Sequence, residues 1–139
     1  MELLKNLSLA EVESLAFALA KKVNSRLVIG LSGDLGSGKT TFVKAFAKAL
    51  GIKKIKSPSF IVIDTYSLGA KKFYHIDLYR LETAKQLKHL GLDHLLAESH
   101  IIAAIEWINK FPRLTKSCDV LIHFEVQDQL HRNVSVKLL

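Results

Sequence analysis

The alternation of apolar and polar positions divides the chain into segments of helical and of extended character. In the segment 8–23, apolar residues recur three and four positions apart, and Ser8 and Glu11 have the spacing of a helical capping box. Apolar residues again recur at helical spacing over 42–50, and Gly51 ends that pattern. Both segments are therefore predicted to be helices that bury one face.

Runs rich in β-branched and aromatic residues predict the strands, and two of them flank Gly69 as a hairpin would. The last two runs also predict an antiparallel pair. A further helical segment, 83–99, is broken at Gly91. The alternation of strands and helices predicts an α/β structure around a mixed sheet. The predicted strands cover residues 26–31, 60–68, 71–79, 101–107, 119–126 and 131–139.

Composition is that of an ordinary globular chain, with 49% hydrophobic and 24% charged residues among 139. The single cysteine, Cys118, excludes an intramolecular disulfide and a cysteine-based zinc site, and it fits a reducing compartment. No apolar run approaches the ~18 residues of a membrane span. The N-terminus lacks the pattern of a signal peptide. We therefore expect a cytoplasmic protein without membrane association.

Basic residues outnumber acidic ones. Twenty Lys and Arg against thirteen Asp and Glu give a formal net charge of +7. Such a balance favours a polyanion as partner, and it is equally typical of lysines spread over solvated surfaces. Because the lysines are scattered along the chain, charge by itself predicts only an indirect or weak contact with nucleic acid.

A glycine-rich loop joins the strand predicted at 26–31 to the helix predicted at 42–50. Its residues Gly33 to Thr40 match the phosphate-binding pattern G-x-x-x-x-G-K-[ST] at every position. Glycines let successive backbone N–H groups turn toward an anion, and the helix adds the positive end of its dipole. Lys39 is expected to reach the β- and γ-phosphates and Thr40 to ligate Mg²⁺. The predicted loop contacts are Gly33, Asp34, Leu35, Gly36, Ser37, Gly38, Lys39, Thr40 and Thr41.

The motif predicts a single P-loop NTPase domain over residues 1–139, whose mixed, mostly parallel sheet is flanked by helices. In such proteins a second magnesium anchor ends a buried strand beside the loop. Glu106 follows five apolar residues and is the candidate; the alternative is an acid that only marks the exposed end of the strand. The guanine-recognition motif N-K-x-D is incomplete in this chain, because Pro112 stands where the motif has its aspartate. ATP is therefore favoured over GTP.

A dense polar cluster, "YHIDLYRL", follows the predicted hairpin. Strand alternation would place His75, Asp77 and Tyr79 on one face. A histidine, a carboxylate and a phenol in line indicate a functional site, and the alternative is a solvated edge face.

The order "GDLGSGKTTF", "SPSF", "YHIDLYRL", Gly-Leu-Asp and "AIEW" resembles the TsaE family over nearly the whole chain. The combination of H-x-D-x-Y-R with E-W distinguishes this family from other P-loop proteins, whereas the phosphate loop alone would not. The resemblance implies a small ATPase that binds ATP and Mg²⁺, is slow alone, and is required for threonylcarbamoyl modification of adenosine next to the tRNA anticodon. It implies as partners a TsaD-type threonylcarbamoyl transferase and a TsaB-type protein.

The resemblance also implies residue roles. Glu106 would be the acid of the metal strand, Asp77 would belong to the family signature, and Trp107 would lie beside the nucleotide or the partner surface. The family commonly has threonine where this chain has Ser59. The serine hydroxyl could still contact the γ-phosphate or lie on the Mg²⁺ side of the site. The region of Arg132 and the first helix are candidates for the adenine pocket.

The predicted function is ATP hydrolysis, with Lys39, Asp77 and Glu106 as catalytic residues and with Thr40, Glu106 and Asp77 at the metal. Asp77 would orient the attacking water or bind metal-bound waters. Arg80 would act in cis, or a partner would complete the site. Two alternatives remain open at this point, a small-molecule P-loop kinase and a nucleotide-gated tRNA-binding module.

Overall fold

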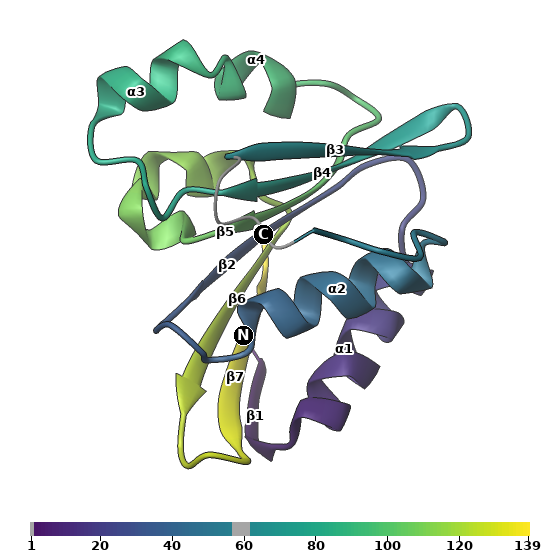
Figure 1. Cartoon of the computed structure of the whole chain (residues 1–139), viewed down its shortest axis with the longest axis vertical. Helices are drawn as coiled ribbons and strands as arrows, with labels where there is room; N and C mark the ends of the chain where they lie inside the picture. Colours follow the sequence, from purple (N-terminus) through teal and green to yellow (C-terminus); the bar gives the residue numbers. More distant parts are fainter. Residues whose placement is uncertain (1, 57–61) are drawn as a thin grey trace.

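The computed structural model describes residues 2–56 and 62–139, which form one mixed sheet with helices on both faces (Figure 1). In this part of the chain the sheet has seven strands in the order β1-β7-β6-β2-β5-β4-β3. The strands are β1 (Glu2–Leu7), β2 (Leu27–Gly33), β3 (Ile63–Leu68), β4 (Lys71–Asp77), β5 (Ile102–Glu106), β6 (Val120–Val126) and β7 (Arg132–Leu138). The helices are α1 (Leu9–Lys21), α2 (Lys39–Ala49), α3 (Ala84–His89) and α4 (Leu92–Leu96), with 3₁₀ turns η1 (Ile108–Lys110) and η2 (Pro112–Ser117).

The centre of the sheet is parallel and its margins are antiparallel. Strand β2 pairs in parallel with β5 and β6, and β4 pairs in parallel with β5. Strands β1, β7 and β6 form antiparallel pairs at one margin, and β3 pairs antiparallel with β4 at the other. The prediction of an α/β P-loop fold with a mixed sheet flanked by helices is confirmed.

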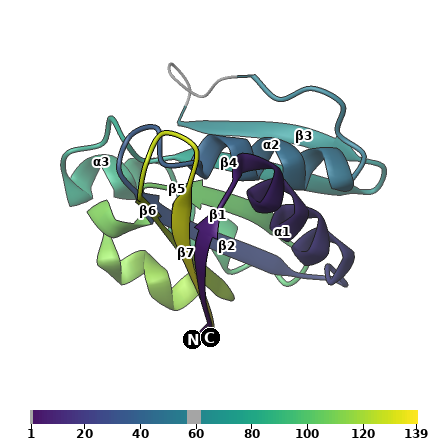
Figure 2. The same ribbon diagram turned by 90° about the horizontal axis from the view of Figure 1, so that it is seen from below.

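Two apolar cores lie on the two faces of the sheet. Helices α1 and α2 cover one face, and α3, α4 and the 3₁₀ turns cover the other (Figures 1 and 2). Strand β5 is buried throughout because both its faces are covered, with Ile102 and Ala104 toward α2 and Ala103 and Ile105 toward α3. This double coverage explains why the strand reads as a continuous apolar run.

The predicted helices and hairpins are confirmed. Helix α1 begins with the capping box: the Ser8 side chain accepts the backbone N–H of Glu11, and the Glu11 side chain accepts the backbone N–H of Ser8. The helical break at Gly91 separates α3 from α4, and Gly91 adopts a left-handed φ of 68°. The two hairpins form as β3–β4 and β6–β7.

Strand β1 was not predicted from the sequence. It pairs antiparallel with β7, so that the two ends of the described chain lie side by side (Figure 2). Its register shifts between Leu4 and Leu7, and Asn6 has a positive φ of 54°. This irregularity interrupts the alternation of exposed and covered positions, and it leaves no period-two pattern to read.

None of the helices in the described ranges is both long and apolar enough to cross a membrane.

Candidate functional site

The glycine-rich loop lies where β2 ends and α2 begins. Gly33, Gly36 and Gly38 have positive φ values of 141°, 77° and 117°. A Cβ on Gly33 would come within 2.6 Å of the backbone oxygen of Phe124 and 2.7 Å of Ser37 Oγ, so this position requires glycine. Gly38 is the N-cap of α2 and offers no side-chain acceptor. The first N–H groups of the helix are therefore free to bind an anion.

Lys39 lies inside this loop and is only 4% exposed. Its ammonium donates to the carbonyl oxygens of Gly33 and Asp34, the latter at 3.0 Å, and its Nζ lies 4.1 Å from the ring centroid of Trp107. Burial lowers the pKa of Lys39 below its usual range, and the nearby carboxylates oppose this shift. An anion held in the loop would stabilise the positive charge of the Lys39 ammonium and so raise this pKa.

Glu106 connects three elements at the end of β5. Its Oε1 accepts a hydrogen bond from Thr40 Oγ1 at 3.0 Å, and its Oε2 accepts one from His75 Nε2 at 2.5 Å. Parallel pairing aligns Glu106 with Leu31 of β2, which brings the carboxylate to the loop. Glu106 is 2% exposed, so the alternative of an acid at an exposed strand end is wrong.

Asp77 ends β4 directly beside Glu106, its register partner on β5. It accepts the backbone N–H of Tyr79 at 3.0 Å. Burial raises the pKa of Asp77 above its usual range, the charge of Glu106 raises it further, and the Tyr79 hydrogen bond lowers it. Two carboxylates thus meet at adjacent strand ends, on the sheet face that α2 covers.

The prediction that His75, Asp77 and Tyr79 share one face needs a correction. His75 and Asp77 do alternate on β4, but the strand ends at Asp77 and the alternation ends with it. The chain turns there, with Leu78 N–H donating to the carbonyl oxygen of Glu106 at 3.1 Å. Tyr79 is 51% exposed, and its ring centroid lies 4.9 Å from that of Trp107. The alternative of a solvated edge face is wrong for His75, which is fully buried.

Two further predicted residues flank the loop. Trp107 follows Glu106 with a left-handed φ of 62°, and its ring contacts both the ammonium of Lys39 and the ring of Tyr79. Arg132, at the start of β7, is 4% exposed, and its Nε donates to the carbonyl oxygen of Ser37 at 3.2 Å. Arg132 therefore lies against the phosphate loop itself.

The loop region carries buried donors that lack acceptors. Within residues 2–56 and 62–139, Ser37 Oγ and Arg132 Nη1 are buried and make no hydrogen bond. Unpaired donors of this kind are unfavourable unless an acceptor is supplied. Together with the buried ammonium of Lys39, they fit a site for an anion rich in acceptor oxygens.

The candidate metal ligands are a hydroxyl and two carboxylates from three elements, namely Thr40, Glu106 and Asp77. Oxygen donors of this kind suit Mg²⁺, which keeps several waters and needs few protein ligands. No group of three or more His, Cys, Asp or Glu able to hold a metal occurs in the part of the chain that the structure describes. The donor set therefore fits Mg²⁺ bound together with phosphate, and it does not form a self-contained metal cage.

The remaining predicted residues that the structure describes lie at the edge of the candidate site. Asp34 and Leu35 are exposed at the tip of the loop, and Thr41 is half-buried on the first turn of α2. Arg80 is exposed just after Tyr79. Ser59 lies outside the described residues.

Sequence reasoning placed His75 near the site without finding its contact with Glu106. The two residues are 31 positions apart, and only the pairing of β4 with β5 brings them together. The available signal was the spacing of His75 and Asp77, which puts both on the face that carries Glu106.

The fold and the loop define a protein of the P-loop nucleotide-binding class. A family model described as "Threonylcarbamoyl adenosine biosynthesis protein TsaE" matches residues 7–134. The chain therefore belongs to the TsaE family.

Individual relatives agree with this assignment. The chain is 37% identical to a tRNA threonylcarbamoyladenosine biosynthesis protein TsaE of Aquifex aeolicus, over 98% of each chain. It is 32% identical to the TsaE protein of Haemophilus influenzae, over 79% of this chain and 69% of that protein. Among solved structures, that of Bacillus subtilis YdiB superposes with a TM-score of 0.74 at 27% identity, covering 99% of this chain and 86% of that one.

Proposed function

We propose that this chain is a magnesium-dependent ATPase of tRNA threonylcarbamoyladenosine biosynthesis, acting in the cytoplasm. The observation that carries the proposal is the junction at the loop, where Thr40 donates to Glu106 beside the buried ammonium of Lys39. A phosphate-binding loop, a metal-binding hydroxyl and a buried carboxylate meet there, as nucleotide hydrolysis requires. Family membership supports the pathway, because the family and the relatives carry its name.

Lys39 holds the β- and γ-phosphates in this proposal. Its present acceptors are two neutral carbonyl oxygens of its own loop. A phosphate oxygen is charged and therefore a stronger acceptor, so the ammonium would exchange the carbonyls for the nucleotide. With the loop N–H groups, it offsets the charge that develops on the leaving phosphate. Arg132, whose Nη1 lacks a partner in the described chain, adds positive potential against the loop.

Thr40, Glu106 and Asp77 would hold Mg²⁺, Glu106 directly or through water. The bound ion would neutralise charge on the β- and γ-phosphate oxygens. Glu106 also fixes the Thr40 hydroxyl, since it accepts that hydrogen bond on one oxygen while His75 holds the other. Asp77, the half-buried register partner of Glu106 on β4, would orient the attacking water.

We propose ATP as the nucleotide, because Pro112 replaces the aspartate of the guanine-recognition motif N-K-x-D. Trp107 contributes an aromatic face beside Lys39. Thr41, on the first turn of α2, would donate its hydroxyl to a phosphate oxygen, and the role of Ser59 stays a prediction. The proposed partners are a TsaD-type transferase and a TsaB-type protein. Two arginines are engaged away from the loop, Arg26 with the carbonyl oxygens of Leu96 and Glu98 and Arg113 with Asp93. A partner group that completes the site would explain slow turnover by the chain alone.

The test is phosphate release from ATP by the purified chain, with and without Mg²⁺, followed by reconstitution with a TsaD–TsaB pair and tRNA. The Lys39→Ala variant should lose hydrolysis while it keeps its fold, and omission of the chain should stop repeated tRNA modification. Unchanged turnover by Lys39→Ala would remove the argument from the loop. Transfer of phosphate to a small acceptor in place of water would favour the small-molecule kinase.

A further inference from the structure

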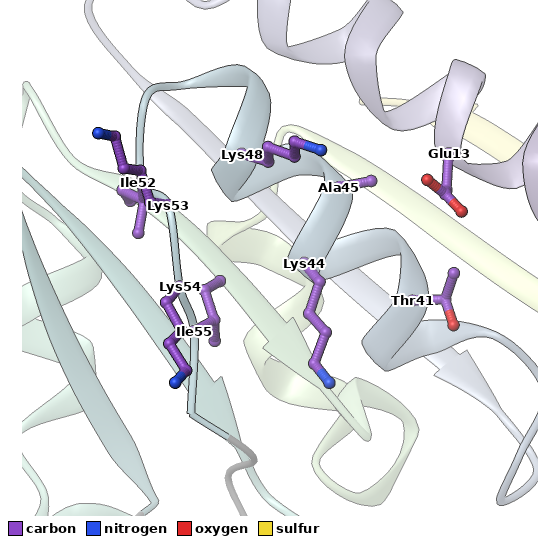
Figure 3. Close-up of a pocket in the computed structure, with 9 residues that line it drawn as sticks. All are labelled: Glu13, Thr41, Lys44, Ala45, Lys48, Ile52, Lys53, Lys54 and Ile55. Carbon is purple, nitrogen blue, oxygen red and sulfur yellow. The ribbon is translucent and has the colours of Figure 1, made fainter.

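A basic groove runs along α2, away from the phosphate loop. Its volume is about 440 Å³, and it lies between α2 and the segment Ile52–Ile55 that follows the helix (Figure 3). Thr41, on the first turn of α2 next to the phosphate loop, is one of its lining residues, so the groove begins beside the candidate nucleotide site. Its lining consists of Glu13, Thr41, Lys44, Ala45, Lys48, Ile52, Lys53, Lys54 and Ile55.

The walls of the groove carry four lysines and one carboxylate. Lys44 and Lys48 stand one turn apart on α2, and Lys53 and Lys54 line the opposite wall. Figure 3 shows Lys44 and Lys54 extending in the same direction from the two walls. All four lysines are exposed, and within residues 2–56 and 62–139 none of them forms an ion pair. Positive charge is therefore concentrated in a concave surface, where the described lining has four ammonium groups and one carboxylate.

We propose that this groove binds the phosphodiester backbone of an RNA. Lysine ammonium groups are compact point charges that bind phosphates, and concentrated positive charge in a cleft attracts a polyanion. None of the described lining residues has an aromatic side chain on which a base could stack. The groove is therefore suited to contacts with the backbone, which position a nucleic acid without reading its sequence.

The charged side chains among the described lining residues are four lysines and Glu13, so the positive groups are ammonium point charges and not the planar fork of arginine. Lysine charges attract phosphates and carboxylates alike. An acidic protein segment is therefore the alternative that the experiment separates from RNA. The inference does not rest on ATP hydrolysis, because none of the four lysines is a residue of the proposed catalytic site.

The experiment measures binding of a fluorescent, unmodified tRNA transcript to the full chain across a series of salt concentrations. The test variant is Lys44→Gln with Lys48→Gln, and the matched control is Lys85→Gln with Lys88→Gln on α3. Both pairs remove two exposed charges from one helix, and α3 covers the opposite face of the sheet. The groove pair should weaken binding and lower the slope of log K against log salt by roughly 1.4–1.8, while the control pair leaves both unchanged.

A second variant separates charge from shape. Lys44→Arg with Lys48→Arg keeps the charge and should keep tRNA binding. The groove pair should also retain ATP binding and hydrolysis at the level of the unaltered chain, which distinguishes the groove from the nucleotide site.

Four results would overturn the proposal. They are absence of tRNA binding by the unaltered chain, equal weakening by the control pair, loss of ATP binding in the Lys44→Gln, Lys48→Gln variant, and groove-dependent binding of polyglutamate in place of tRNA. Loss of ATP binding would assign the groove to the nucleotide. Because hydrolysis is measured separately, failure of this inference leaves the proposed ATPase activity untouched.

Discussion

The hydrogen bond between His75 and Glu106 should make a large contribution to the stability of the site. Both side chains are buried, at 0% and 2% exposure, and their atoms Nε2 and Oε2 lie 2.5 Å apart. A carboxylate only accepts hydrogen bonds, so His75 is the donor. His75→Leu would leave one oxygen of a buried carboxylate without that donor. Breaking a buried pair in this way costs about 3–5 kcal/mol.

A double-mutant cycle isolates this contribution. The variants are His75→Leu, Glu106→Gln and the two combined. The neutral amide of Glu106→Gln is less unfavourable to bury unpaired than a carboxylate, so the combined variant should be more stable than the sum of the single effects predicts. The expected coupling is about 1–3 kcal/mol. His75→Gln is the control, because its amide can still donate a hydrogen bond, and it should be less destabilised than His75→Leu.

The assay is urea unfolding, followed by circular dichroism and by fluorescence of Trp107, the single tryptophan. This residue follows Glu106 in the chain, so its emission also reports on the site. A loss of about 3 kcal/mol should lower the midpoint urea concentration by roughly 1–3 M, because the unfolding free energy of small proteins falls by about 1–3 kcal/mol per M urea. Single effects that add within about 0.5 kcal/mol would refute the reasoning, since they would mean that the two side chains do not stabilise one another.

Three further predictions address the loop, the second carboxylate and the cysteine. Gly33→Ala places a Cβ 2.6 Å from the Phe124 carbonyl at a φ of 141°, so it should lower stability by more than ~1 kcal/mol and weaken nucleotide binding, measured by thermal melting with and without ATP. An unchanged melting temperature would contradict this. Because burial raises the pKa of Asp77 above its usual 3.8, its stabilising contribution is full below that unfolded-state value and is lost as pH rises through the folded-state pKa. Asp77→Asn should therefore gain stability relative to the unaltered chain as pH rises from about 4. Urea unfolding at a series of pH values tests this, and parallel pH profiles would disprove it. Burial raises the pKa of Cys118 to about 12, so a thiol reagent at about pH 8 should label it only after unfolding. Rapid labelling of the native protein would show that the thiol is accessible.

The phosphate loop could be predicted from the sequence because it is contiguous. Each of its glycines, its lysine and its threonine is specified by local backbone geometry and by the adjoining strand and helix, and no distant residue is needed to recognise them. The same holds for α1, whose capping box and apolar periodicity lie within one segment. Strand β1 escaped prediction because its pairing with β7, and not its own pattern, makes it a strand.

The construction of the site was decided by tertiary structure. Thr40 and Glu106 are 66 positions apart and Ser37 and Arg132 are 95 apart, and they meet only because β2 pairs with β5 and β6 pairs with β7 beside the loop. Local patterns of apolar residues specify that strands form, but they do not specify which strands become neighbours or where each one ends. The sequence by itself therefore determined the chemistry of the loop and the candidate acids. The sheet decided that His75 supports Glu106, that Tyr79 leaves their face, and that Arg132 lies against the loop.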